Sequence, residues 1–226
     1  MEPYNPIILK ERPERCPICG GEVWKILYGE PTPEAYEKRH ETKTIFAGCC
    51  ITEHDPAWQC DDCYTPIYEG TDMGRQPHMA YATCIVRHED LLPITKTVIH
   101  IAYDTKNDRY AAQGIVRTYY GNDISEYALR VGKERVRQLF SDGNMQRLAQ
   151  AAKVTELPLI LDGASMWLRV ECGGELCTIE RNSANVDMDD TMPLFMQQME
   201  KIHARWHNEE GYEIGNTNNE IRRFLR

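Results

Sequence analysis

The chain has 226 residues, of which 42% are hydrophobic and 27% are charged, and its formal net charge is −9. This composition is typical of a globular protein, and no apolar run approaches the roughly 20 residues of a membrane-spanning helix. The negative charge disfavours a broad phosphate-binding surface, because nonspecific affinity for nucleic acid depends on lysine and arginine. The first residues lack a basic stretch followed by an apolar one, so we expect no secretory signal and a cytoplasmic location.

Two Cys-x-x-Cys pairs are the strongest motif, formed by Cys16 with Cys19 and by Cys60 with Cys63. Each turn can direct two sulfur atoms to one ion, and two such turns complete a tetrahedron around zinc. Four sulfur ligands leave no open position for water or substrate, so we expect one structural Zn²⁺. An odd total of nine cysteines, together with the expected location, favours reduced thiolates over disulfides.

The cysteine pairs lie within a first domain predicted at residues 1–69. Gly20 and Gly21 permit a tight turn after the first pair, and a strand should follow at 23–28. Thr32 can cap a short helix that begins at Pro33. We therefore expect a small antiparallel β module with a helix inserted between the two cysteine pairs.

This region resembles a zinc-ribbon family that forms the N-terminal module of many uncharacterised bacterial proteins. The resemblance covers less than a third of the chain and implies zinc and a ribbon fold, but no settled activity. Tyr64 departs from the pattern, because such turns often have glycine at this position. The matching motifs lie at 16–21, 28–31, 48–49 and 56–63.

Cys49 and Cys50 permit two interpretations. Adjacent thiols near a metal can be redox-active or nucleophilic when a nearby positive charge lowers their pKa. No Lys, Arg or His is immediately beside them, so the sequence favours small hydrophobic core residues.

A connector is predicted at residues 70–95, because Gly70, Gly74 and Pro77 lie among polar residues. Within it, the pattern at 78–86 is compatible with either a strand or a helix. His88 and the two acidic residues after it are metal-ligand types. Consecutive side chains rarely converge on one ion, so we expect a solvated turn there.

The remaining domain, residues 96–207, is predicted to be α+β, with helices on one face of an antiparallel sheet. A closing helix has an apolar stripe formed by Phe195, Met199, Ile202 and Trp206. A polar tail is expected at 208–226. Strands are predicted at 97–103, 110–119, 126–131, 157–161, 166–171 and 176–181, and helices at 133–140 and 146–153.

The second half of this domain loosely resembles another bacterial domain of no known function, on the motifs at 161–163, 167–170 and 173–174 and the closing helix. That resemblance implies a fold and no activity.

Cys172 and Cys177 flank the glycine pair at 173–174 and are predicted to remain reduced. A two-residue hairpin would pair Cys172 with Glu175 and Val170 with Cys177, which places the two thiols diagonally.

His203 and His207 are four residues apart on the closing helix, a spacing at which two imidazoles can bind one metal. The intervening residues lack the catalytic glutamate of a metalloprotease helix. Favourable interaction of cations with a helix C-terminus is the simpler interpretation.

Three functions remain as hypotheses. The first is a zinc-stabilised, non-enzymatic interaction or adaptor protein that binds a protein partner. The second is nucleic-acid binding through the zinc ribbon, although acidic residues are interspersed among the bases. The third is a hydrolase that uses His100, Asp104 or the residues around His88. The candidate phosphate contacts are Lys10, Arg12, Arg15, Lys38, Arg39 and Lys43.

Overall fold

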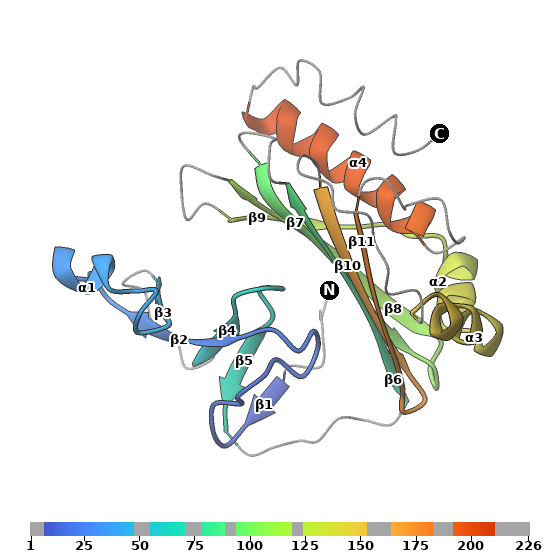
Figure 1. The fold of residues 1–226 in the computed structure, drawn as a ribbon, viewed down its shortest axis with the longest axis horizontal. Helices are drawn as coiled ribbons and strands as arrows, with labels where there is room; N and C mark the ends of the chain where they lie inside the picture. Colours follow the sequence, from blue (N-terminus) through green and yellow to red (C-terminus); the bar gives the residue numbers. More distant parts are fainter. Residues whose placement is uncertain are drawn as a thin grey trace. The chain divides into compact units, whose positions relative to one another are not determined.

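The structure is a computed structural model that divides into two compact units, Met1–Gln76 and Pro77–Arg226 (Figure 1). Both units contain strands and helices, and antiparallel pairs dominate the two sheets, so the α+β class is confirmed. The described residues are 7–47, 55–70, 78–88, 94–118, 124–152, 164–182 and 192–210.

The first unit contains a five-stranded sheet in the order β1-β5-β4-β2-β3. The pairs β1–β5 and β2–β3 are parallel, whereas β4 is antiparallel to both of its neighbours. The strands are β1 (Ile7–Leu9), β2 (Val23–Tyr28), β3 (Thr44–Ala47), β4 (Trp58–Cys60) and β5 (Pro66–Glu69).

The predicted helical insertion is present as α1 (Pro33–Glu37), between β2 and β3. The Thr32 side chain accepts a hydrogen bond from the backbone N–H of Ala35 at 3.2 Å, which satisfies one of the free donors at the helix start. None of the α1 side chains is buried, so the helix adds nothing to the core of the unit.

The second unit is built on a six-stranded sheet in the order β11-β10-β6-β7-β8-β9, with every neighbouring pair antiparallel. Its strands correspond to most of those that the sequence predicts, while the predicted strand at 157–161 lies outside the described residues. The strands are β6 (Met79–His88), β7 (Ile94–Asp104), β8 (Arg109–Thr118), β9 (Ile124–Ala128), β10 (Ala164–Cys172) and β11 (Glu175–Asn182).

The position of β6 corrects the predicted connector at 70–95. This strand pairs with β10 on one side and β7 on the other, so it is an inner strand of the sheet. Nearly all of its residues are buried, including those on both faces. A strand buried on both faces shows no alternation of apolar and polar residues, which is why its periodicity did not distinguish it from a helix.

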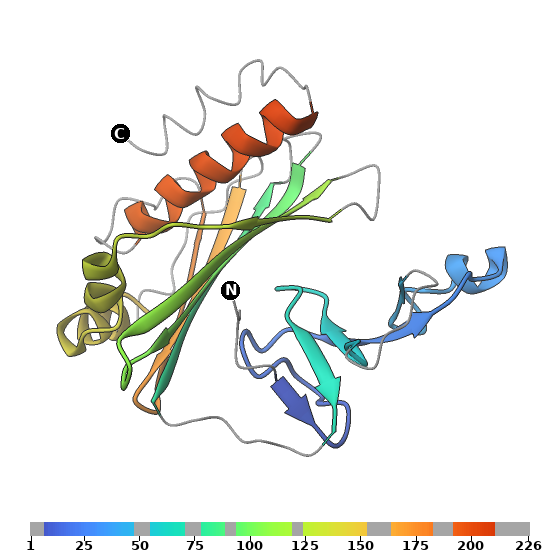
Figure 2. The same ribbon diagram turned by 180° about the vertical axis from the view of Figure 1, so that it is seen from behind.

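Three helices complete the second unit, and α4 (Met192–Glu210) lies across one face of the sheet (Figures 1 and 2). The apolar stripe predicted for this helix is confirmed, because its four residues are all buried against the sheet. The other helices are α2 (Lys133–Leu139) and α3 (Asp142–Ala151), which follow β9 in the chain.

The hairpin of β10 and β11 has the predicted register. Cys172 pairs with Glu175 and Val170 pairs with Cys177, and the two cysteines are free thiols. The turn is closed by two glycines with positive φ, Gly173 at 59° and Gly174 at 84°.

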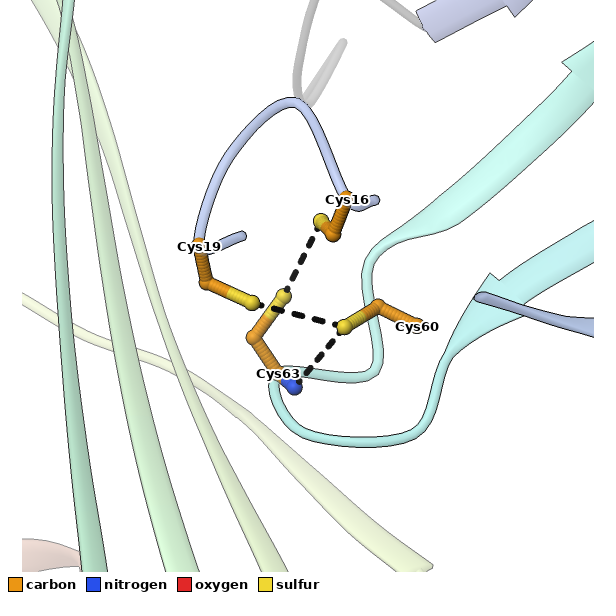
Figure 3. A group of neighbouring side chains, drawn as sticks. All are labelled: Cys16, Cys19, Cys60 and Cys63. Atoms are coloured by element: carbon orange, nitrogen blue, oxygen red, sulfur yellow. Dashed lines mark hydrogen bonds between the residues drawn. The ribbon is translucent and has the colours of Figure 1, made fainter. Parts of the chain in front are cut away.

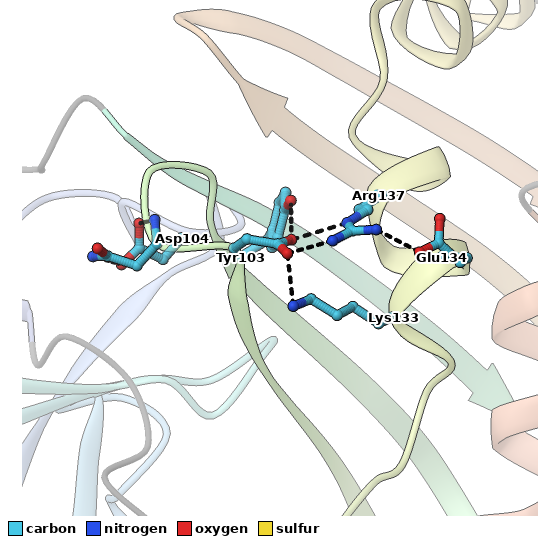
Figure 4. Close-up of polar contacts among 7 residues, drawn as sticks. Tyr103, Asp104, Lys133, Glu134 and Arg137 are labelled. Carbon is cyan, nitrogen blue, oxygen red and sulfur yellow. Dashed lines mark hydrogen bonds and ion pairs between the residues drawn. The ribbon is translucent and has the colours of Figure 1, made fainter.

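A group of polar contacts fastens α2 to the turn between β7 and β8 (Figure 4). The Asp108 carboxylate accepts hydrogen bonds from Tyr103 Oη at 2.8 Å and from Arg137 Nε at 3.0 Å, and Lys133 Nζ lies 2.6 Å from it. Hydrogen bonds from Arg137 and then Lys133 hold the pKa of Asp108 well below its usual value. The ionised carboxylate of Asp108 thus links the turn between β7 and β8 to Lys133 and Arg137 of α2.

We predict that Gly114→Ala lowers the free energy of unfolding by about 1–3 kcal/mol, through overpacking. A Cβ atom at Gly114 would lie 2.3 Å from Cδ1 and 2.8 Å from Cγ1 of Ile202, a buried residue of the apolar stripe of α4. Denaturant unfolding measures the change.

Gly143→Ala in α3 is the matched control, because a Cβ atom there meets nothing within 4 Å. It should leave stability unchanged or raise it by up to about 1 kcal/mol. Ile202→Val, which removes Cδ1, should partly restore the Gly114→Ala variant. Equal effects of the two glycine substitutions would contradict the close packing of α4 on β8.

Candidate metal centre

The four cysteines of the two Cys-x-x-Cys pairs converge on one point (Figure 3). Their Sγ atoms all lie within 4.8 Å of one another, and all four residues are buried. The Sγ atoms of Cys16 and Cys63 are 3.7 Å apart, and those of Cys19 and Cys60 are 3.4 Å apart. All four are free thiols. The sequence prediction that these residues form one group is therefore met, and the group can hold a metal ion.

The local backbone directs donors at the sulfur atoms. Backbone N–H groups of Ile18 and Gly21 donate to the Sγ atoms of Cys16 and Cys19 at 3.4 and 3.3 Å. The Thr65 hydroxyl lies 2.9 Å from Cys63 Sγ. Donors of this kind stabilise negative charge on sulfur and orient it.

The turn after each cysteine pair requires a left-handed residue. Gly20 has a φ of 76° in the first turn, and Tyr64 has a φ of 57° in the second. Tyr64 therefore adopts the conformation for which glycine is common at this position, and its side chain is buried. For a residue with a Cβ atom this conformation costs roughly 1–2 kcal/mol, which the surrounding structure must offset.

The electrostatics of the cluster favour a cation. Hydrogen bonds from Cys19, Cys60 and Cys63 hold the pKa of Cys16 far below its usual value. Burial raises the pKa of Cys63 well above its usual value, and the contacts with Cys16 and Cys19 raise it further. These contacts favour a negative charge on Cys16 and disfavour one on Cys63, and a cation among the sulfur atoms would stabilise both as thiolates.

The donor set and its dimensions fit a tetrahedral ion. Zn–S bonds of about 2.3 Å place the sulfur atoms of a tetrahedron about 3.8 Å apart. The Sγ–Sγ separations of 3.4 Å between Cys19 and Cys60 and 3.7 Å between Cys16 and Cys63 are close to that spacing. Four buried sulfur ligands fill the shell, which is the arrangement of structural rather than catalytic sites.

Gly21 allows the two cysteine turns to approach each other. A Cβ atom at this position would lie 2.4 Å from Asp62 Oδ2 and 2.7 Å from Asp62 Cβ. Asp62 lies between Cys60 and Cys63, so the first turn contacts the second at a position where only a hydrogen fits.

The histidines do not lie where the sequence analysis placed them. His88 was expected in a solvated turn, but it is buried at the end of β6, and its Nε2 lies 3.1 Å from Thr97 Oγ1. His203 was interpreted as a cation near a helix end. It is also buried, with its Nε2 2.7 Å from the same hydroxyl, and burial lowers its pKa to about 3. His207, one turn further along, is half-buried.

The residues suggested for a hydrolase are not brought together. His100 lies on the opposite face of β7 from Thr97, where its Nδ1 is 3.0 Å from Thr83 Oγ1. Asp104 ends β7 and accepts hydrogen bonds from Asn107 and from the backbone of the turn. Cys49 and Cys50 lie outside the described residues.

Two of the six candidate phosphate contacts interact within the protein. Lys43 Nζ forms an ion pair with Glu22 at 2.9 Å. The Arg39 guanidinium lies over the Tyr36 ring, 4.2 Å from its centroid. The ion pair of Lys43 reduces the positive charge that this part of the first unit offers to a phosphate backbone, whereas the ring contact leaves the charge of Arg39 in place.

A small apolar surface on the first unit was missed by the sequence analysis. Leu27 and Phe46 are register partners on β2 and β3, and the Tyr36 ring of α1 lies 6.3 Å from the Phe46 ring, centroid to centroid. Leu27 is 39% exposed and Tyr36 is 38% exposed. We refer to Leu27, Tyr36 and Phe46 as the apolar patch. Its members come from three elements, which local periodicity does not connect.

Comparison with known proteins finds no protein family that matches the chain and no match among curated proteins. Among the helices of the described residues, none is long and apolar enough to cross a membrane. The cysteine cluster and the apolar patch are therefore the features from which a function must be argued.

We predict that Gly21→Ala weakens metal binding by about 10–100-fold, the range typical of changes just outside a ligand shell. The added Cβ atom must push the two cysteine turns apart while all four sulfur ligands remain. Competition with a chromogenic chelator measures the affinity. Gly143→Ala in the second unit is the control, and equal affinities for both variants would show that the close approach to Asp62 has no role.

Proposed function

We propose that the first unit is a zinc ribbon and that the protein is a non-enzymatic interaction protein. One Zn²⁺ bound by Cys16, Cys19, Cys60 and Cys63 has a structural role in this proposal. The supporting observation is the burial of all four sulfur ligands, which leaves no position for substrate or water at the ion.

The apolar patch is the surface that we assign to a protein partner. Two large apolar side chains, Leu27 and Tyr36, are each exposed by nearly 40% in neighbouring elements of the same unit. Aromatic and aliphatic side chains grouped in this way are typical of the centres of protein interfaces. This exposed group is the observation that carries the proposal, since α1 contributes a helix to the unit without burying any side chain.

The patch is also held in a fixed arrangement before a partner arrives. The Tyr36 ring contacts the Arg39 guanidinium, 4.2 Å from its centroid, and its centroid lies 6.3 Å from that of the Phe46 ring. A side chain that is already ordered loses less entropy on binding, which improves affinity for a given contact area. The guanidinium beside the ring adds a charged group at the edge of the patch, where it can pair with a carboxylate of the partner.

We predict that the purified protein contains a single zinc ion per chain and that Cys19→Ser lowers its zinc affinity by more than about 100-fold. Removing one sulfur opens the shell and leaves the ion with three of its four sulfur ligands. Inductively coupled plasma mass spectrometry measures the metal. Cys172→Ser, at a half-buried thiol outside the cluster, is the control and should keep full zinc content. Iron in place of zinc, or an unchanged affinity in Cys19→Ser, would contradict the assignment.

We predict that Leu27→Ser combined with Tyr36→Ser weakens capture of the protein partner by more than about 10-fold, because interface centres supply most of the binding free energy. Affinity purification from a native extract, with each bound protein quantified against its amount in the control, measures this change. Leu176→Ser is the matched control, since Leu176 is 50% exposed but lies in the second unit.

The zinc content of both variants should equal that of the unaltered chain. A partner lost equally from both variants would contradict the role of the patch. Salt-sensitive recovery of DNA or RNA, abolished by nuclease and unaffected by the patch substitutions, would favour the nucleic-acid hypothesis instead.

A further inference from the structure

Two buried histidines share one hydroxyl group between α4 and the sheet. His88 ends β6, Thr97 lies on β7 and His203 lies on α4. The Nε2 atoms of His88 and His203 lie 3.1 and 2.7 Å from Thr97 Oγ1, and the two ring centroids are 5.3 Å apart. We call these three residues the histidine cluster. It is a polar link between α4 and two inner strands in a largely apolar interface, in which Gln198 of α4 is also buried.

In the histidine cluster, only the Nε2 atom of each imidazole ring has a hydrogen-bond partner among the described residues. Thr97 Oγ1 serves both Nε2 atoms, because a hydroxyl offers one donor and two acceptor positions. Within the described part of the chain, neither the buried Nδ1 atom of His88 nor that of His203 has a hydrogen-bond partner. An imidazolium carries N–H donors at both nitrogens, so charging either ring would place a buried donor and a positive charge where no acceptor lies.

The surroundings also disfavour charge on the rings. His88 pairs with Ala164 on β10, and Thr97 pairs with Val116 on β8. Neither of these neighbours can ionise. No described carboxylate forms an ion pair with either ring. Burial lowers the pKa of His88 to about 4, and burial together with His88 lowers the pKa of His203 to about 3. The charged or titratable residues within four positions of the cluster on its own described elements are Cys84, Arg87, Lys96, His100, Glu200, Lys201, Arg205 and His207, and Arg181 lies on β11.

Those neighbours do not supply a counter-charge. Arg87 directly precedes His88 on β6, and Lys96 directly precedes Thr97 on β7. Because successive side chains of a strand alternate, both cations point to the opposite face of the sheet from the cluster. Arg181, on the same face, is a further cation and donates to the Ala151 carbonyl at 2.8 Å. Glu200 is the one acidic residue a turn away on α4, and it is partly exposed.

We propose that the histidine cluster is an acid-sensitive latch, which holds α4 on the sheet while both rings are neutral and releases it when they take up protons. Release would expose the apolar stripe of α4 and the strands beneath it. Because the latch belongs to the second unit alone, it does not depend on the metal centre or on the apolar patch of the first unit.

The pH range of the latch follows from the difference between its docked and released states. A solvent-exposed histidine has a pKa of about 6.5, so the released rings bind protons more tightly than the docked rings. Docking is therefore fully stable above about pH 6.5 and is lost as the pH falls from there towards about 4. Each ring contributes up to one proton to the opening equilibrium.

The test is hydrogen exchange of the amides of α4 at about pH 7 and about pH 4.5, corrected for the intrinsic pH dependence of exchange. With two latch histidines, the opening equilibrium constant should rise about 4,000-fold between these values, the product of about 60-fold for His88 and about 75-fold for His203. In His203→Gln, which keeps a neutral polar side chain, the rise should fall to about 60-fold.

His207→Gln is the matched control, since this half-buried histidine lies on the same helix outside the cluster, and it should keep the full pH dependence. Exchange in the first unit is followed in parallel, so that loss of metal in acid is recognised separately. An equally steep pH dependence in His203→Gln and in the unaltered protein would overturn the proposal.

A measurement on the unaltered protein covers the case in which His203→Gln does not fold. The imidazole nitrogen chemical shifts of His88 and His203 should report neutral rings for as long as α4 stays protected from exchange. Rings that become charged near pH 6.5 while α4 remains protected would show that no latch exists.

Discussion

Convergence of four cysteine sulfurs is the constraint on which the first unit depends. Its strands are only three to six residues long, and strands of this length do not form a stable sheet by themselves. The cysteine turns fix the start of β2 against the end of β4, which sets the register of Val23 with Cys60. In the proposed zinc ribbon, a bound metal ion would take the place of the large apolar core that a unit of this size lacks, and its binding free energy would become folding free energy.

The second unit relies on a different kind of interaction. Its inner strands are buried on both faces of the sheet. The helix α4 covers one of these faces with a continuous apolar stripe. Burial of that stripe supplies most of the attraction between helix and sheet, but apolar contacts alone tolerate sliding of one surface over the other. The shared hydroxyl of Thr97 fixes His203 of α4 at one position along β7, because a hydrogen bond requires a defined geometry.

The sequence predicted those structural features that depend on short motifs, each only a few residues long. The spacing of the cysteine pairs was sufficient to group four ligands, and the glycine pair at 173–174 was sufficient to fix the pairing of Val170 with Cys177. The role of His88 was not predictable in this way. Acidic residues follow it in the chain, which suggests solvent, whereas its burial results from pairing with β10 and contact with a helix more than a hundred residues away. Strand order decides such contacts, and local periodicity contains no information on it.

The placement of the apolar patch connects the cysteine cluster with the proposed interaction. Parallel strands cannot be joined by a tight turn, so the chain between β2 and β3 must cross over, and α1 forms part of that connection. Leu27 and Phe46 become neighbours only when β3 pairs with β2, and β2 is itself positioned by the first cysteine turn. An ion bound as proposed would therefore determine whether the patch exists without contacting a partner, because it would order the strand on which the patch is assembled.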